Sequence, residues 1–324
     1  MPPPIVVTEQ LGKSFIVRTK AGRLRRTRRV VDAVAGVSVS IEAGEMVGYL
    51  GPNGAGKSTT IKMLTGILTP SSGHVEVAGL VPMRARVALA RRIGVVFGQR
   101  SQLWWDLPLV ESFDLLHHVY RTDDDRHRHN VGELVELLDL REQLDVPVRQ
   151  LSLGQRMKGE LVAALLHDPR VLFLDEPTIG LDVVSKHAVR EGLRRLVDER
   201  AVTVLLTTHD LADVEQLCRR VVIIDHGRVI YDGDLDTLRA VHGRERTLVV
   251  DLVETSVPLR VEGAETVRVD GARQWLRFDG ASTSAADVLA SVSHQADVRD
   301  LSIEETDIDE IVRRIYLGDG PGAG

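Results

Sequence analysis

The sequence predicts an α/β protein built on a parallel β-sheet and followed by a smaller α+β domain. Three observations predict this fold class. Short apolar runs, typical of buried strands, alternate with helical patterns long enough to serve as crossover connections. A glycine-rich loop stands directly between one such strand and a helix. After Gly233 the apolar residues follow the spacing of short strands and single helices.

The composition is that of an ordinary globular chain. Its 324 residues are 43% apolar and 27% charged, which is enough for a large core and a second domain. No stretch approaches the roughly 18 apolar residues of a membrane span, and residues 1–10 lack the order of a signal peptide, so we expect a cytosolic chain. The single cysteine, Cys218, excludes an internal disulfide and is expected to be a small buried side chain. The net charge of −6 argues against general nucleic-acid binding.

The first predicted elements are a strand from Ile5 to Phe15 and a basic arm at residues 18–29. We expect the arm to form a surface hairpin. It could contact anionic lipid head groups or be a solvated loop, and the sequence leaves both open. Its cationic side chains are Arg18, Lys20, Arg23, Arg25, Arg26, Arg28 and Arg29.

Next comes the glycine-rich loop, which follows the apolar strand Met46–Leu50 and precedes a helix predicted from Lys57 to about Leu68. Glycines allow successive backbone N–H groups to turn toward one anion, and the helix N-terminus adds partial positive charge. Lys57 can reach terminal phosphates, and Ser58 can offer its hydroxyl to Mg²⁺. The loop is Gly51, Pro52, Asn53, Gly54, Ala55, Gly56, Lys57 and Ser58.

Further along, residues 107–167 have helical patterns without a strand candidate up to residue 150, which predicts a helical subdomain. Buried strands are predicted on either side of it, at Ile93–Phe97, Val171–Leu174, Val202–Leu206 and Val221–Ile224.

Two carboxylates, Asp175 and Glu176, directly follow the second of these strands, Val171–Leu174. Ligands bind at the carboxyl ends of strands in open α/β sheets, so both side chains are candidate site residues. Asp175 is suited to hold Mg²⁺ through water, and Glu176 to polarise the water that attacks a γ-phosphate. A pair that merely caps the next element is the alternative.

Residues 235–317 are predicted to form the C-terminal α+β domain, and residues 318–324 a disordered tail. The last helix is predicted to start at Ser302, because Glu305 three residues later completes a capping box. Other predicted elements are strands near Thr247–Leu252, Thr266–Val269 and Gln274–Phe278, and a helix near Ala285–Val292.

Residues 151–155, Leu-Ser-Leu-Gly-Gln, resemble the signature Leu-Ser-Gly-Gly-Gln of ABC transporter ATP-binding subunits. The resemblance extends over roughly Val6 to Asp232 and implies a P-loop NTPase core of the ABC ATPase type. It also implies a head-to-tail dimer in which Gly51 to Thr59 of one chain and Ser152, Gly154 and Gln155 of the other hold each ATP. Leu153 departs from the family's glycine. A simple helix cap at Ser152 is the alternative.

The resemblance implies roles for four more residues. Gln99 matches the glutamine that contacts Mg²⁺ and relays the nucleotide state to the permease, and His209 matches the histidine that touches the γ-phosphate. Asp182 belongs to the loop after the catalytic carboxylate, where Ile179 replaces the more usual serine or alanine. Phe15 stands where the family stacks an aromatic ring on adenine, with core packing as the alternative.

By resemblance, then, the chain is a cytoplasmic ATP-binding and ATP-hydrolysing subunit that powers a membrane transporter, in particular an exporter. We expect it to lie peripherally on the cytoplasmic side of the cell membrane, as a homodimer, with pairing to a sister subunit as the alternative. A permease could dock on a row of large apolar side chains, or the row could pack in the core. The row is Leu103, Trp104, Trp105 and Leu107.

Two other functions compete with transport. A soluble ABC-type ATPase that acts on nucleic acid or ribosomes would use the basic arm, but the chain lacks coiled-coil heptads and zinc-ligand spacing. A subunit that only binds ATP is favoured weakly by Leu153 and Ile179 and opposed by Lys57, Glu176 and His209.

Overall fold

The structure is a computed structural model that describes residues 3–20, 26–98, 100–242, 245–254, 257–305 and 308–317. Gln99, two arginines of the basic arm (Arg23 and Arg25) and the predicted tail at 318–324 lie outside these residues. The chain divides into two compact units, Met1–Gly233 and Asp234–Gly324. No helix in the described part of the chain combines the length and apolar character needed to cross a bilayer.

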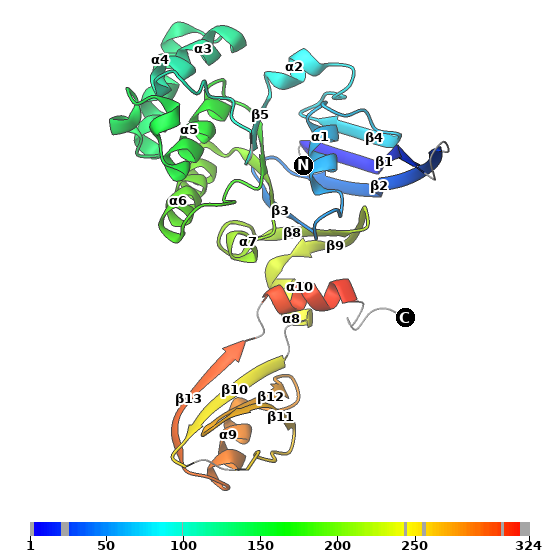
Figure 1. Ribbon diagram of the computed structural model, residues 1–324, viewed down its shortest axis with the longest axis vertical. Helices are drawn as coiled ribbons and strands as arrows, with labels where there is room; N and C mark the ends of the chain where they lie inside the picture. The colour runs from blue at the N-terminus through cyan, green and yellow to red at the C-terminus, as the bar shows by residue number, and fades with distance from the viewer. Residues whose placement is uncertain are drawn as a thin grey trace. The chain divides into compact units, whose positions relative to one another are not determined.

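The first unit is built on a six-stranded sheet with the order β5-β6-β7-β3-β8-β9 (Figure 1). Its first five strands pair in parallel, so their carboxyl ends meet at one edge, which confirms the predicted α/β core. Every residue of β7 is buried, which explains the continuous apolar run in the sequence. The strands are β3 (Met46–Leu50), β5 (Ile93–Phe97), β6 (Val171–Asp175), β7 (Thr203–Thr208), β8 (Arg220–Asp225) and β9 (Arg228–Asp234).

A three-stranded antiparallel sheet, ordered β2-β1-β4, belongs to the same unit. Strand β1 spans Val6–Lys20, β2 spans Arg26–Ile41 and β4 spans Ser72–Val77. β1 therefore continues beyond the predicted end at Phe15, because its last residues pair with β2 as far as Lys20 and Arg26. The two flanks of the basic arm are thus the strands of one antiparallel ribbon.

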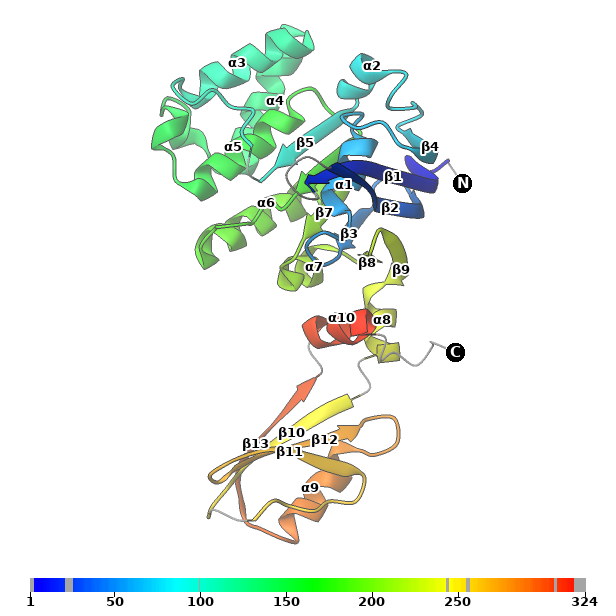
Figure 2. The same ribbon diagram turned by 45° about the vertical axis from the view of Figure 1, so that its right-hand side comes forward.

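Helices cover the large sheet and form a separate layer around α3, α4 and α5 (Figure 2). The phosphate loop leads into α1 (Lys57–Leu64), which is shorter than the predicted helix because Gly66 adopts a left-handed φ of 74°. Buried Leu109, Phe113, Leu134 and Leu161 occupy the interior of the helical layer. The other helices are α2 (Arg86–Ala90), α3 (Leu109–Tyr120), α4 (Asp124–Leu137), α5 (Leu153–Leu165), α6 (Val183–Arg200) and α7 (Leu211–Leu217), with short 3₁₀ turns at Arg141–Gln143 and Val148–Gln150.

The second unit is an antiparallel four-stranded sheet, ordered β11-β12-β10-β13, with α9 packed on its apolar side. Residues such as Leu248, Leu276, Phe278 and Val288 make that core. Two further helices, α8 and α10, contact each other. The elements are α8 (Leu235–His242), β10 (Glu245–Leu252), β11 (Ala264–Asp270), β12 (Arg273–Asp279), α9 (Ala285–Ser293), β13 (Val298–Glu305) and α10 (Ile308–Leu317).

The helix start predicted at Ser302 is wrong. Ser302 lies in β13, where it pairs with Val249 of β10, and the final helix begins at Ile308. Pairing along the whole length of β10 outweighs the local preference of a Ser-x-x-Glu sequence for a helix cap, because a cap contributes only about 1 kcal/mol.

Candidate nucleotide site

The glycine-rich loop forms the connection between β3 and α1, at the carboxyl edge of the parallel sheet. Gly54 has a φ of 87° and Gly56 a φ of 107°, which are conformations that other residues adopt at a cost. A Cβ atom on Gly56 would also lie 2.4 Å from the carbonyl oxygen of Ala33. The loop therefore requires glycine here, and its turn aims the N-terminus of α1 at the same edge.

Lys57 is almost entirely buried, with 7% of its surface exposed. Its Nζ donates hydrogen bonds to the carbonyl oxygens of Gly51, at 2.5 Å, and Pro52, at 3.4 Å. Burial lowers the pKa of Lys57, and the nearby carboxylates of Glu176 and Asp175 oppose this effect only in part. A desolvated cation inside an anion-binding loop fits a phosphate group.

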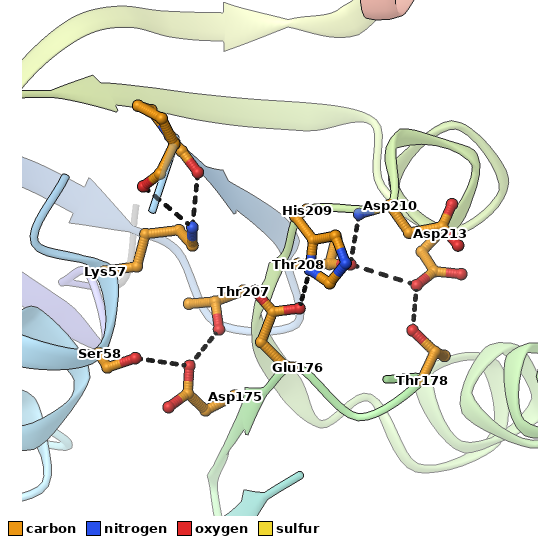
Figure 3. Close-up of polar contacts among 12 residues, drawn as sticks. Lys57, Ser58, Asp175, Glu176, Thr178, Thr207, Thr208, His209, Asp210 and Asp213 are labelled. Carbon is orange, nitrogen blue, oxygen red and sulfur yellow. Dashed lines mark hydrogen bonds and ion pairs between the residues drawn. The ribbon is translucent and has the colours of Figure 1, made fainter. Parts of the chain in front are cut away.

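Ser58 and Asp175 meet between α1 and β6 (Figure 3). The Ser58 hydroxyl donates to Oδ1 of Asp175 at 3.2 Å, and the Thr207 hydroxyl donates to the same oxygen at 2.6 Å. Hydroxyl and carboxylate oxygens suit Mg²⁺, which commonly takes one or two protein oxygens plus phosphate and water. No three His, Cys, Asp or Glu side chains gather into a metal cluster among the described residues, and this binding mode needs none.

The Glu176 carboxylate contacts the imidazole ring of His209 (Figure 3). Glu176 directly follows β6, and His209 directly follows β7. His209 Nδ1 lies 2.5 Å from Glu176 Oε2. The backbone of Glu176 has a left-handed φ of 58°, and its N–H donates to the carbonyl of Thr207 at 2.9 Å. A non-glycine residue in this conformation is uncommon and is frequent at functional sites.

A cavity of about 310 Å³ opens beside these contacts. Both carboxylates and Ser58 face it, together with two cations, Lys62 and Arg100. Gln99 is outside the described residues, and its neighbours Gly98 and Arg100 both line the cavity. The remaining lining residues are Ile67, Phe97 and Ile179.

The signature segment begins α5 with a complete capping box. The Ser152 hydroxyl accepts from the Gln155 N–H at 3.2 Å, and the Gln155 side chain accepts from the Ser152 N–H at 2.9 Å. The cap anticipated at Ser152 is therefore present at the N-terminus of α5. Gly154 lies against α6, where a Cβ would be 2.6 Å from the Ser185 hydroxyl oxygen.

Leu153 and Ile179, the two residues that depart from the family pattern, lie close to glycines of neighbouring loops. A Cβ on Gly180 would lie 3.4 Å from Leu153, and one on Gly98 would lie 3.1 Å from Ile179. Asp182 caps α6 by accepting from the backbone and the hydroxyl of Ser185, and these hydrogen bonds lower the pKa of its carboxyl group.

Three aromatic side chains that the sequence analysis singled out are exposed. Phe15 is 38% exposed, which contradicts the alternative of core packing, and Lys13 Nζ lies 5.3 Å from the centre of its ring. Trp104 and Trp105 are 40% and 52% exposed, whereas Leu103 is buried. The tryptophans are therefore outside the core.

Sequence reasoning missed two parts of the site. The predicted strand Val202–Leu206 stops one residue before Thr207, which orients Asp175. The buried Asp213 accepts hydrogen bonds from Thr178 and Thr208, one on each side of the Glu176–His209 contact. Polar residues directly after an apolar strand were the available signal, as they were for Asp175.

Comparison with known proteins decides the family. Residues 34–179 match the family model described as ABC transporter. The chain is 35% identical over 216 residues to the ABC transporter ATP-binding protein NatA of Bacillus subtilis, covering 67% of this chain and 87% of that protein. The chain belongs to the ABC transporter ATP-binding proteins. It is therefore an ATPase subunit, of a class that dimerises and works with membrane permease components.

Two further relatives of this ABC ATPase have informative names. A Nod factor export ATP-binding protein of Paraburkholderia xenovorans is 38% identical, over 72% of each chain. A solved dimeric ATP-binding cassette in a post-hydrolysis state, bound to ADP and Pi, has a TM-score of 0.59 and 26% identity, covering 71% of this chain and 98% of that one.

Proposed function

We propose that this ABC ATPase hydrolyses Mg²⁺-ATP between two copies of itself on the cytoplasmic face of the cell membrane and drives an export permease. The observation that carries the proposal is the convergence of Lys57, Ser58–Asp175 and Glu176–His209 at one sheet edge. A cation, a hydroxyl–carboxylate pair and a second carboxylate are the groups that phosphoryl transfer to water requires.

Within one chain, each group has a distinct task. Residues Gly51 to Thr59 would hold the phosphates through backbone N–H groups, with Lys57 at the terminal ones. Ser58, Asp175 and Gln99 would hold Mg²⁺, which when bound withdraws charge from the phosphate oxygens. Glu176 would orient the attacking water, and His209, already at its carboxylate, would stabilise the γ-phosphate side.

The exposed face of Phe15 is available to stack on adenine. The partner copy would complete each site with the N-terminus of its α5, formed by Ser152, Gly154 and Gln155, and with Asp182. Closure of the dimer is favoured only as far as ATP binds the closed state better than the open one, and hydrolysis removes that preference.

Export is supported by the name of the Nod factor export relative. Docking of a permease beside Gln99 is supported by the exposure of Trp104 and Trp105. Ser101 and the Gln102 N–H hydrogen-bond to Glu160 of α5, which anchors this surface to the helix that carries the signature. We assign residues 235–317 to an accessory domain that extends or regulates the dimer.

The test is to capture tagged Glu176→Gln protein, with ATP and Mg²⁺, from detergent-solubilised membranes of its source organism. Blocked hydrolysis should trap the closed, permease-bound form, so an integral membrane protein is expected to co-purify. Lys57→Met, in which ATP binding is weakened, is the control and should retain less of that partner at a limiting ATP concentration. Capture of ribosomes, nucleic acid or soluble proteins alone would overturn the transport proposal.

A further inference from the structure

A buried polar cluster adjoins the Glu176–His209 contact on the side of α6 and α7. Its members are Thr178, Arg190, Thr208 and Asp213, here called the Asp213 cluster. Asp213 is 0% exposed, Thr208 1% and Thr178 2%. Polar groups this far from water remain buried only when their hydrogen bonds are satisfied.

Thr178 and Thr208 both contact the Asp213 carboxylate, as Figure 3 shows, and Arg190 contacts it as well. Oδ2 accepts a short hydrogen bond from the Thr178 hydroxyl and a second one, at 3.3 Å, from the Thr208 hydroxyl. Oδ1 accepts from Arg190 Nε at 2.5 Å. Arg190 neutralises the charge, which makes its burial tolerable.

The two threonines belong to the two segments that carry the reacting groups. Thr178 follows Glu176 by two residues and accepts the Leu181 N–H at 3.2 Å, in the turn that leads to Asp182. Thr208 directly precedes His209, and its hydroxyl also accepts the Asp210 N–H at 3.0 Å. One carboxylate oxygen therefore ties together the chain on both sides of the Glu176–His209 hydrogen bond.

Neighbouring charges reinforce this arrangement. Lys186 Nζ lies 2.5 Å from Asp210 Oδ2, and Arg190 reaches the same oxygen at 3.7 Å. Burial opposes ionisation of Asp210, but Lys186 and Arg190 outweigh it and lower the pKa of this carboxyl group. The segment Thr208–Asp213 is thus fixed to α6 at both of its acidic residues.

We propose that Asp213 is a positioning residue for ATP hydrolysis, which sets the position of Glu176 relative to His209 through Thr178 and Thr208. The inference rests on the roles proposed above for Glu176 and His209. Asp213 acts through these residues, since its own carboxylate oxygens are engaged by protein donors. Misplacement of a reacting group by about 1 Å can lower a rate about 10²-fold, so a loss of about tenfold corresponds to a smaller displacement.

The variant of choice is Thr178→Val, which removes one hydroxyl from the cluster and keeps the shape of the side chain. Asp213→Asn would leave the buried Arg190 charge with only the longer contact to Asp210 and endanger folding. Thr208→Val is the second variant. The matched control is Thr203→Val, since Thr203 is 1% exposed at the other end of β7, where its hydroxyl accepts the Gly44 N–H.

The experiment measures kcat, KM for ATP and Tm of the full chain. Thr178→Val and Thr208→Val should each lower kcat about tenfold and change KM by less than about twofold, because nucleotide binding does not use these hydroxyls. Thr203→Val should lower Tm by about as much as Thr178→Val and Thr208→Val do, and it should leave kcat unchanged. A kcat of Thr178→Val within about twofold of wild type would overturn the proposal.

A second measurement separates positioning from general stability. In a His209→Ala background, single-turnover rates should fall by less than about twofold on adding Thr178→Val, because the contact that it positions is already lost. A full tenfold further loss would refute the inference and leave the proposed function intact. If His209→Ala alone left the rate unchanged, the proposed role of His209 would itself be wrong.

Discussion

Replacement of Lys57 by methionine should weaken ATP binding without weakening the fold. Lys57 is 7% exposed, and its charge is held by the carbonyl oxygens of Gly51 and Pro52. Exchange of a buried charge for an apolar side chain of similar length removes the desolvation cost of that charge. The structure therefore predicts opposite effects on the free and the ATP-bound protein.

The direction of the stability change in nucleotide-free Lys57→Met follows from the pKa of Lys57. Burial lowers the pKa of Lys57 in the folded chain, so folding disfavours its charged form. That penalty applies at pH values below the folded pKa and disappears as the pH rises above the unfolded value. At neutral pH, nucleotide-free Lys57→Met should therefore be at least as stable as the wild type. Binding loses a charge-assisted hydrogen bond of about 1.5–3 kcal/mol, or about 10- to 150-fold in Kd.

Thermal unfolding with and without ATP and Mg²⁺ measures both quantities on one sample. The wild type should gain Tm on adding ATP, and Lys57→Met should gain little from an equal or higher starting Tm. Lys158→Met in α5, outside the phosphate loop, is the control and should keep the full ATP-dependent gain. A nucleotide-free Lys57→Met protein that is clearly less stable than wild type would refute the reasoning.

Three other predictions concern surfaces and the second unit. Trp105→Ala should keep the ATPase rate of the free subunit and lose transport in cells, because an exposed ring contributes to docking and not to the core; a parallel loss of ATPase would contradict this. Truncation after Gly233 should weaken ATP-trapped dimers in light scattering, and an unchanged dimer fraction would exclude a dimerisation role. Arg28→Ser with Arg29→Ser, both exposed, should reduce binding to anionic but not neutral vesicles; equal binding by wild type and variant would reject lipid contact.

The sequence was most informative where local chemistry and fold require the same residues. The phosphate loop was recognisable because position 56 requires glycine, both for its positive φ and for the close approach of the loop to Ala33. The residue type alone therefore indicates the backbone conformation. Asp175 and Glu176 were recognisable for a similar reason, since polar residues directly after an apolar strand meet a ligand edge.

Sequence reasoning was least informative where distant segments decide. Ser302 and Glu305 form a helix-start pattern, yet pairing with β10 makes them strand. The exposure of Phe15 depends on how far β1 and β2 remain paired, and the residues around Phe15 do not specify that length. The Asp213 cluster joins three separate segments, and the sequence of one segment does not indicate that its side chain contacts the other two.

The central claim is that Glu176 is the carboxylate at which ATP is hydrolysed. The most direct test is the ATP turnover of full-length Glu176→Gln beside Glu191→Gln, a half-exposed glutamate of α6 that pairs with Arg194 at 3.0 Å. The account predicts a fall of about 10²–10⁴-fold for Glu176→Gln with ATP still bound, and no change for Glu191→Gln. Turnover by Glu176→Gln within about twofold of wild type would contradict the account and place the hydrolytic centre elsewhere.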